Sequence, residues 1–159
     1  MVVDIIQCLS TAELESKSAK ALALYVKDTG NIKGRGVFAG RRFSVGEPVE
    51  VAPVIVFEAG VMPRIIANIL YDWERHTGEP KARAIALGYG SLYNHDNPAN
   101  LKYVVDGPAR VIRFVALRDI VADEELTINY NHAGGRSDPG SDPWFKNHQV
   151  KPYSRAQPE

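Results

Sequence analysis

The sequence contains one cysteine, Cys8, among its 159 residues. A single cysteine excludes a disulfide within the chain and a cysteine-rich zinc cluster, and it is compatible with a reducing compartment. No apolar run reaches the roughly 20 residues that a membrane-spanning helix needs. The N-terminal stretch also lacks the basic residues of a secretory signal. We therefore expect an intracellular protein, cytoplasmic or nuclear, with neither a membrane span nor a signal peptide.

An excess of charge of either sign is also absent, because Lys plus Arg and Asp plus Glu each total 19. A chain without net charge has no long-range field that would attract nucleic acid or an acidic membrane. We therefore expect no direct nucleic-acid binding and no membrane partner. With 45% hydrophobic and 24% charged residues, the chain is suited to one compact domain that buries roughly two-thirds of its unfolded surface.

Short apolar runs separated by turn residues predict a mostly β protein. We predict strands at 21–27, 36–39, 82–87, 101–105 and 110–116, and one or two strands at 49–57, broken at Pro53. One helix is predicted over 61–75, where apolar residues recur at helical spacing after Pro63, namely Ile65, Ile66, Ile69, Leu70 and Trp73. The sequence therefore indicates small sheets with one inserted helix.

Polar and small residues mark the ends of this domain. Residues 1–20 are expected to form an N-terminal arm, and the Gly, Ser, Asp and Pro residues at 132–143 predict a flexible linker. The segment 144–159 begins with the aromatic residues Trp144 and Phe145 and continues as a polar tail. The folded domain is therefore expected over 21–131.

Three segments carry more polar and glycine residues than simple connections need. Residues 33–38 read KGRGVF, residues 94–97 read NHDN, and residues 123–130 read DEELTINY. Taken singly, they have ordinary interpretations: a glycine turn between strands, a turn stabilised by Asn and His side chains, and a half-buried strand tyrosine. Glu124 and Glu125 are adjacent on a strand and point to opposite faces, which disfavours a shared acid–base pair.

Two other functions are disfavoured by the surroundings of these segments. The glycines satisfy a loose dinucleotide-binding fingerprint, but that site needs a helix opening at Gly36. Gly40, Gly46 and Pro48 follow too closely for such a helix. No second His, Cys or carboxylate lies at ligand spacing from His95, so we expect no metal site.

In this order and with this spacing, the three segments resemble those of the SET-domain family of S-adenosylmethionine-dependent protein lysine methyltransferases. That family has a GxG segment, an Asn-His-Ser-Cys-type segment and a Gly-Glu-Glu-Leu-Thr-x-x-Tyr-type segment. The resemblance covers about residues 23–145. It implies the SET fold, in which several small, mostly antiparallel sheets surround a C-terminal strand that threads beneath a preceding segment in a pseudoknot-like arrangement.

The resemblance also implies which residues form the site. The residues expected to bind S-adenosylmethionine, and its product S-adenosylhomocysteine, are Lys33, Gly34, Arg35, Gly36, Asn94, His95 and Trp144. Tyr130 matches the family's catalytic tyrosine, and Tyr103 matches a tyrosine that lines the lysine channel. Trp144, or in second place Phe145, is expected to stack on the adenine. The ordinary alternative is that Trp144 fills a hydrophobic groove.

Methyl transfer to a lysine depends on alignment of the neutral amine, the methyl carbon and the sulfur. Aromatic walls suit this reaction because they exclude water, lower the pKa of an ammonium by desolvation and tolerate a cation over their faces. The hydroxyl of Tyr130 can hold the polarised methyl through weak C–H contacts. No side chain is an evident base, so we expect the amine's proton to leave through water.

The resemblance therefore implies an enzyme that methylates a lysine of a protein or peptide substrate, with a histone or another DNA-associated protein among the candidates. Asp96 and Asn97 stand where the family commonly has Ser and Cys, and Pro98 comes one place early before Asn100. These departures favour the alternative of a catalytically silent SET module that binds a peptide or a partner protein.

Overall fold

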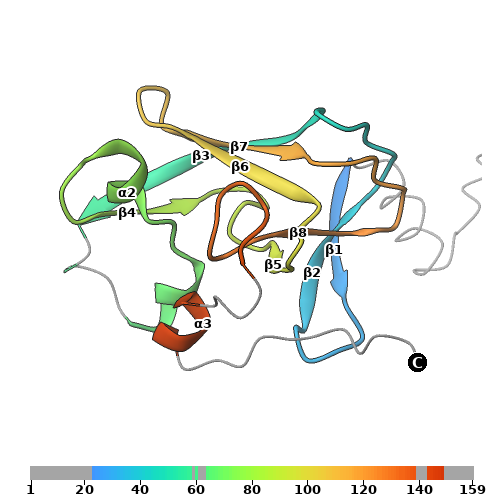
Figure 1. Ribbon diagram of the computed structural model, residues 1–159, viewed down its shortest axis with the longest axis horizontal. Helices are drawn as coiled ribbons and strands as arrows, with labels where there is room; N and C mark the ends of the chain where they lie inside the picture. Colours follow the sequence, from blue (N-terminus) through green and yellow to red (C-terminus); the bar gives the residue numbers. More distant parts are fainter. Residues whose placement is uncertain (1–22, 59, 61–63, 139–142, 149–159) are drawn as a thin grey trace, which may run out of the picture.

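The computed structural model describes residues 23–58, 60, 64–138 and 143–148, so the expected arm and tail lie outside the described residues (Figure 1). Two four-stranded sheets form the domain. The first has the order β1-β2-β8-β5, from β1 (Leu24–Asp28), β2 (Arg35–Ala39), β8 (Glu125–Ile128) and β5 (Asn94–His95). The second has the order β4-β3-β7-β6, from β4 (Ala82–Ala86), β3 (Pro48–Glu58), β7 (Val111–Ala116) and β6 (Leu101–Asp106). The prediction of a mostly β fold with small sheets is confirmed.

β3 is one continuous strand of 11 residues, so the predicted break at Pro53 is wrong. Proline has no N–H to donate, but pairing with β7 ends at Pro53 and pairing with β4 begins at Val54. The Pro53 carbonyl still accepts a hydrogen bond from the Leu87 N–H at 2.8 Å. The missing donor therefore falls where the strand changes partners, and the strand continues.

The single helix predicted over 61–75 is also wrong. Arg64–Ile69 form a 3-10 helix, η2, and Trp73–Thr77 form a short α-helix, α2, while the predicted first turn lies outside the described residues. Between these helices the backbone of Tyr71 pairs with Ala84 of β4, with N–O distances of 2.9 and 3.0 Å. This pairing uses the N–H and C=O of Tyr71 that a continuous helix would need, so the sheet interrupts the helix.

Local capping explains where α2 begins and ends. The side chain of Asp72 accepts a hydrogen bond from the Arg75 N–H at 3.2 Å. Gly78 ends the helix in the left-handed region, at φ 79°. Trp73 is fully buried, and its indole N–H donates to Glu79 at 3.0 Å. These contacts hold α2 against the sheet beside the pocket described below.

One hydrophobic cluster joins the two sheets. Its largest side chains are Trp73, Tyr93, Phe43, Phe114, Leu101, Ile112, Ile120 and Leu126. Burial of each large apolar side chain contributes about 1.5–3 kcal/mol.

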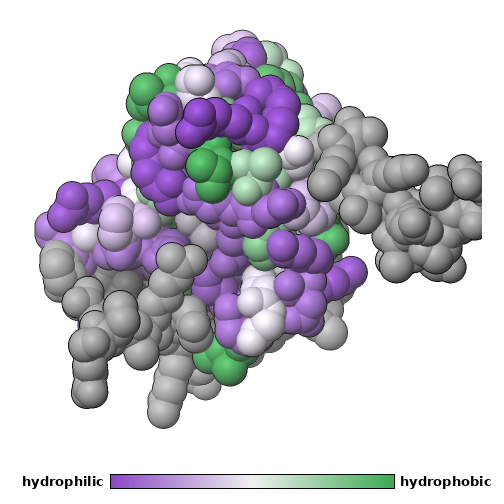
Figure 2. Space-filling view, turned by 90° about the vertical axis from the view of Figure 1, so that its right-hand side faces the viewer, coloured by the Kyte–Doolittle hydropathy of each residue, from purple (hydrophilic) through white to green (hydrophobic). Residues whose placement is uncertain are grey.

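No described helix is long and apolar enough to span a bilayer. The right-hand face of the molecule is mostly hydrophilic, with scattered hydrophobic residues (Figure 2).

β8 brings the two polar segments of the sequence together. It pairs antiparallel with β2 and parallel with β5, where Asn94 lies opposite Thr127 and His95 opposite Ile128. The chain that follows β8 then bonds to the segment before and within β6, because the Ala99 and Tyr103 N–H groups donate to carbonyls in 133–135 at 2.9 Å. β8 is therefore enclosed by earlier parts of the chain, as expected of a threaded C-terminal strand.

Asn100 connects these layers through its side chain. Its Oδ1 accepts a hydrogen bond from the Thr127 N–H at 2.8 Å, and its Nδ2 donates to the Glu125 carbonyl at 2.8 Å and to the Glu124 carboxylate at 3.0 Å. The residue is only 3% exposed. Water cannot readily replace these bonds, so the Asn100 amide holds β8 in place.

We predict that Asn100→Ala lowers the free energy of unfolding by about 2–4 kcal/mol, because it leaves a buried N–H and a buried C=O of β8 without partners. Chemical denaturation measures this difference. Asn68→Ala, which truncates an exposed asparagine, is the matched control and is expected to unfold like the wild type. Equal stability of the Asn100→Ala variant and the wild type would contradict the role assigned to Asn100.

Candidate active site

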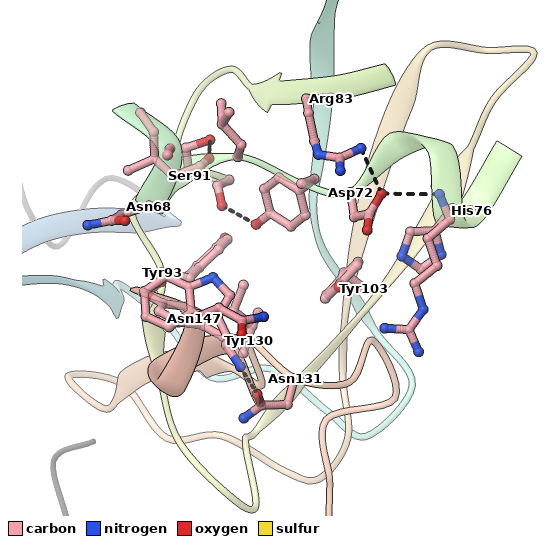
Figure 3. A pocket seen from close by; sticks show the side chains of 18 of the residues that line it. Asn68, Asp72, His76, Arg83, Ser91, Tyr93, Tyr103, Tyr130, Asn131 and Asn147 are labelled. Carbon is pink, nitrogen blue, oxygen red and sulfur yellow. Dashed lines mark hydrogen bonds and ion pairs between the residues drawn. The ribbon is translucent and has the colours of Figure 1, made fainter. Parts of the chain in front are cut away.

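Aromatic residues line a pocket of about 580 Å³ (Figure 3). They come from the segments that precede α2 and β5, from β6, from the end of β8 and from α3 (Pro143–His148). The aromatic residues that line it are Tyr71, Tyr93, Tyr103, Tyr130 and Trp144. Polar side chains complete the lining, among them Asp72, His76, Arg83 and Asn131. Tyrosine and tryptophan rings can exclude water and still accept a cation over their faces.

Tyr130 is held at both its backbone and its hydroxyl. Its N–H donates to Nδ1 of His95 at 3.0 Å, and its hydroxyl donates to the main-chain carbonyl of Tyr93 at 2.9 Å. Burial, followed by the negative charge of Glu125, raises the pKa of Tyr130 to about 12. Tyr130 is therefore a neutral phenol at physiological pH, whose proton is donated to the Tyr93 carbonyl and whose oxygen can still accept from a ligand.

Tyr71 and Tyr103 form a second side of the pocket. Their ring centroids lie 5.2 Å apart in an edge-on arrangement, and the Tyr71 hydroxyl donates to the Gly90 carbonyl at 2.5 Å. Burial raises the pKa of both tyrosines, and the pKa of Tyr71 rises well above the usual value. Sequence reasoning identified Tyr103 but missed Tyr71, because the helical pattern around residue 71 concealed its pairing with β4.

The C-terminal aromatic residues contact the same site from α3. The Trp144 and Tyr130 ring centroids are 4.6 Å apart, and the main-chain N–H of Trp144 donates to the Asn131 side chain at 2.9 Å. Phe145 is 6% exposed and lies 4.8 Å from the His95 ring. Trp144 therefore lines the pocket, while Phe145 packs beneath His95.

The glycine turn lies at the other side of β8, around Glu125. The Lys33 ammonium forms an ion pair with the Glu125 carboxylate at 3.1 Å, and both side chains are 8% exposed. The Asn94 amide donates to Glu125 at 2.9 Å and to the Arg35 carbonyl at 3.1 Å. A Cβ at Gly36 would lie 2.8 Å from Glu125 Oε1, so glycine is required at this position by the packing of the protein itself.

Gly34 differs from Gly36 in what surrounds it. Its φ of +72° lies in the region that favours glycine, and a Cβ built there would meet no heavy atom within 4 Å. The Gly34 carbonyl accepts bonds from the N–H and the hydroxyl of Thr29, at 2.8 and 2.7 Å. The backbone at Gly34 is therefore held in position and open to a ligand on its outer side.

Charged residues lie along the part of the pocket formed by α2. Arg83 forms ion pairs with Asp72 at 3.1 Å and with Glu74 at 3.5 Å. The His76 ring lies 5.8 Å from Tyr103, and burial followed by the charge of Arg75 lowers the pKa of His76. His76 is therefore a neutral imidazole at neutral pH. Sequence reasoning did not identify this residue.

The two adjacent glutamates have different partners, as expected of neighbouring strand residues. Glu124 forms an ion pair with Arg118 and accepts a hydrogen bond from Asn100, whereas Glu125 pairs with Lys33. Burial alone raises the pKa of Glu124, but the hydrogen bonds from Arg118 and Asn100 lower it overall. No group of three or more metal-ligating side chains in the described ranges is arranged to hold a metal ion.

The structure therefore divides the expected site residues into two groups joined by His95. Tyr103, Tyr130 and Trp144 lie in the aromatic pocket. The glycine turn and Asn94 lie around Glu125, because Lys33 and Asn94 both bind the Glu125 carboxylate and Asn94 also bonds to the Arg35 carbonyl. His95 lies between them, paired through its backbone with β8 and bonded through its side chain to Tyr130.

The sequence of this chain is similar to a known family and to a known enzyme. The SET-domain family matches residues 34–131. A histone-lysine N-methyltransferase of Schizosaccharomyces pombe, specific for lysine 37 of histone H3, is 34% identical over 112 residues, which are 67% of this chain and 72% of that protein. The family match contains Gly34 and Gly36 of the glycine turn, the Asn94 segment and the Tyr130 segment.

Solved structures have the same fold. A candidate histone methyltransferase of Plasmodium falciparum is 25% identical, with a TM-score of 0.57 over 69% of this chain and 94% of that chain. A chain of a humanized Chaetomium thermophilum Polycomb Repressive Complex 2, bound to the inhibitor GSK126, is 21% identical, with a TM-score of 0.57 over 70% of this chain and 15% of that chain. The second likeness concerns the fold alone. Together with the family match over residues 34–131, these findings show that the chain belongs to the SET-domain protein lysine methyltransferase family.

Proposed function

We propose that this protein is an S-adenosylmethionine-dependent protein-lysine N-methyltransferase, which transfers a methyl group to the side-chain amine of a lysine in a protein substrate. The observation that carries this proposal is the position of the Tyr130 hydroxyl. It lies in an aromatic pocket and is bonded to the carbonyl that directly precedes Asn94. The two polar segments of the sequence thus meet at the residue that matches the family's catalytic tyrosine.

The residues present fit a sulfonium cofactor. Space is open beside the Gly34 backbone, and the faces of Tyr130 and Trp144 can accept a positive charge. The backbone of 33–36, Asn94 and His95 would hold the cofactor, and the Trp144 ring would stack on its adenine. Lys33 contributes through its backbone, because its ammonium is engaged by Glu125. When bound, the cofactor supplies an electrophilic methyl group on a positively charged sulfur.

The aromatic residues prepare the acceptor lysine. Desolvation between Tyr71, Tyr103 and Tyr130 favours the neutral amine over the ammonium, and the released proton passes to water. The neutral amine would then receive the methyl group that the cofactor supplies, with S-adenosylhomocysteine as the leaving group. The oxygen lone pairs of the Tyr130 hydroxyl would help to orient the methyl group toward the amine. Tyr130 does not act as the base, because its pKa of about 12 keeps it protonated.

A histone is the first substrate to test, because the S. pombe relative is a histone-lysine N-methyltransferase. The pocket lining also includes acidic and basic side chains, represented by Asp72 and Arg75. Such a mixed lining is suited to a peptide that contains residues of either charge.

A binding module without catalysis is the second candidate. It is favoured by Asn97, which stands at a position where the family commonly has Cys. The Asn97 side chain is engaged with Ser137, donating to its carbonyl at 3.1 Å and accepting from its N–H at 3.2 Å. This departure therefore has a structural use that does not depend on methyl transfer.

We predict that Tyr130→Phe lowers methyl transfer at least about 100-fold, because the variant loses the oxygen that orients the methyl group and the bond to the Tyr93 carbonyl. Transfer is measured with labelled S-adenosylmethionine and core histones, and mass spectrometry identifies the acceptor lysine. Tyr25→Phe is the control, since the Tyr25 hydroxyl bonds to Asp123 at an exposed site.

Cofactor binding without methylation of any protein in a mixed lysine-containing pool would instead support the binding module. Full activity of the Tyr130→Phe variant would contradict the catalytic role of Tyr130. A loss of activity in the Tyr25→Phe control would show that tyrosine hydroxyls act through stability rather than through the pocket.

We predict that Trp144→Ala weakens binding of S-adenosylhomocysteine about 2- to 12-fold, because an aromatic stacking contact contributes about 0.5–1.5 kcal/mol. Isothermal titration calorimetry measures this change. Lys146→Ala removes an exposed side chain from the same helix and is expected to bind like the wild type. Unchanged affinity in the Trp144→Ala variant, with weaker peptide binding, would assign Trp144 to the lysine channel alone.

A further inference from the structure

Glu50 lies on β3 and holds two groups of the 88–93 segment. One oxygen of its carboxylate accepts a hydrogen bond from the Tyr89 N–H at 2.8 Å, and the other accepts from the Tyr93 hydroxyl at 2.8 Å. A Cβ at Gly88 would lie 2.6 Å from Glu50 Oε1. The chain therefore approaches this carboxylate as closely as a glycine permits.

Tyr93 connects Glu50 with the reaction site. Its side chain is 2% exposed, and its ring centroid lies 4.7 Å from that of Phe114. Its hydroxyl donates to Glu50, while its main-chain carbonyl accepts from the Tyr130 hydroxyl at 2.9 Å. Two hydrogen bonds and one residue, Tyr93, therefore separate the Glu50 carboxylate from the Tyr130 hydroxyl.

The charge of Glu50 has a cost for stability. Burial raises the pKa of Glu50, although the hydrogen bonds from Tyr89 and Tyr93 oppose this shift. A carboxylate whose pKa is higher in the folded than in the unfolded protein stabilises the fold only at low pH. This stabilisation is complete below the unfolded-state pKa and is lost as the pH rises through the folded-state pKa. The charge of Glu50 in turn raises the pKa of Tyr71 and Tyr93. The buried carboxylate of Glu50 therefore carries a desolvation cost that its two hydrogen bonds offset in part.

We infer that Glu50 is a positioning residue for methyl transfer, because its carboxylate holds the Tyr93 phenol and thereby the carbonyl that orients the Tyr130 hydroxyl. This inference rests on the proposed function. A carboxylate can accept from both Tyr89 and Tyr93, whereas a glutamine accepts from one and must donate to the other. Charge and geometry at residue 50 thus serve the reaction rather than the stability of the sheet.

Glu50→Gln tests this role because it keeps the size of the side chain and removes one acceptor. We expect kcat to fall about 10-fold or more with little change in the KM for the peptide, since small displacements of a reacting group cost this much. The denaturation midpoint at pH 7 is expected to change little, because the loss of one hydrogen bond and the removal of a buried charge have opposite effects on stability. A purely structural role would instead lower the midpoint and leave the kcat of the folded protein unchanged.

Tyr93→Phe is the second variant, and Glu58→Gln is the control. Tyr93→Phe removes the hydroxyl that Glu50 holds and is expected to reproduce the loss of kcat. The double variant is expected to lose no more than either single variant, because both changes break one hydrogen bond. Glu58 lies on the same strand at an exposed position, so Glu58→Gln is expected to retain full activity. The inference would be overturned if the fold-loss of kcat in the double variant equalled the product of the fold-losses in the two single variants.

A readout without catalysis follows Tyr130 directly. In protein labelled with ¹³C at the tyrosine ζ carbon, the Tyr130 resonance is assigned by its absence in the Tyr130→Phe variant. We expect it to shift in the Glu50→Gln and Tyr93→Phe variants and to stay unchanged in the Glu58→Gln variant. A fall in kcat without this shift, or this shift without a fall in kcat, would overturn the inference.

The two proposals fail in different ways. If the wild type methylates no protein, the proposed function fails and the kinetic role of Glu50 fails with it. The Tyr130 resonance then still decides whether Glu50 positions Tyr130. If the wild type is active and the Glu50→Gln variant has wild-type kcat, the proposed function stands and the inference about Glu50 is wrong.

Discussion

The pairing of β8 with β5 is the contact on which the site depends. It is a parallel pairing of two short segments, Asn94 with Thr127 and His95 with Ile128. Because so few backbone bonds join them, side chains complete the connection: Asn100 bonds to the backbone of Glu125 and Thr127, and His95 accepts the Tyr130 N–H. The polar residues that look excessive for a turn therefore hold β8 in place.

The glycine turn is joined to the same strand through Glu125. Its carboxylate binds the Lys33 ammonium and the Asn94 amide, and Gly36 leaves the space that these contacts fill. A larger residue at Gly36 would separate β2 from Asn94. The three sequence segments thus form one network of hydrogen bonds, which explains why residues distant in sequence meet without a metal or a disulfide in the described part of the chain.

The sequence predicted the strands well, because short apolar runs between turn residues need little long-range information. It also predicted that the C-terminal strand threads beneath a preceding segment, but only through the family resemblance. It failed at Tyr71, where pairing with Ala84 interrupts a helical pattern, and at Pro53, where a change of strand partner removes the penalty of proline. Tyr93 and Glu50 were missed because their role passes through a main-chain carbonyl, which no side-chain pattern reveals.

The pocket combines two requirements that conflict in most environments. In the proposed function it must admit a lysine, which arrives as a cation, and it must then favour the neutral amine. Phenols meet both requirements only while they stay protonated, since a phenolate would hold the lysine as an ammonium. Burial supplies this condition by raising the pKa values of Tyr71, Tyr103 and Tyr130. The charge of Glu50 acts in the same direction on Tyr71, so a carboxylate outside the lining helps to keep the lining neutral.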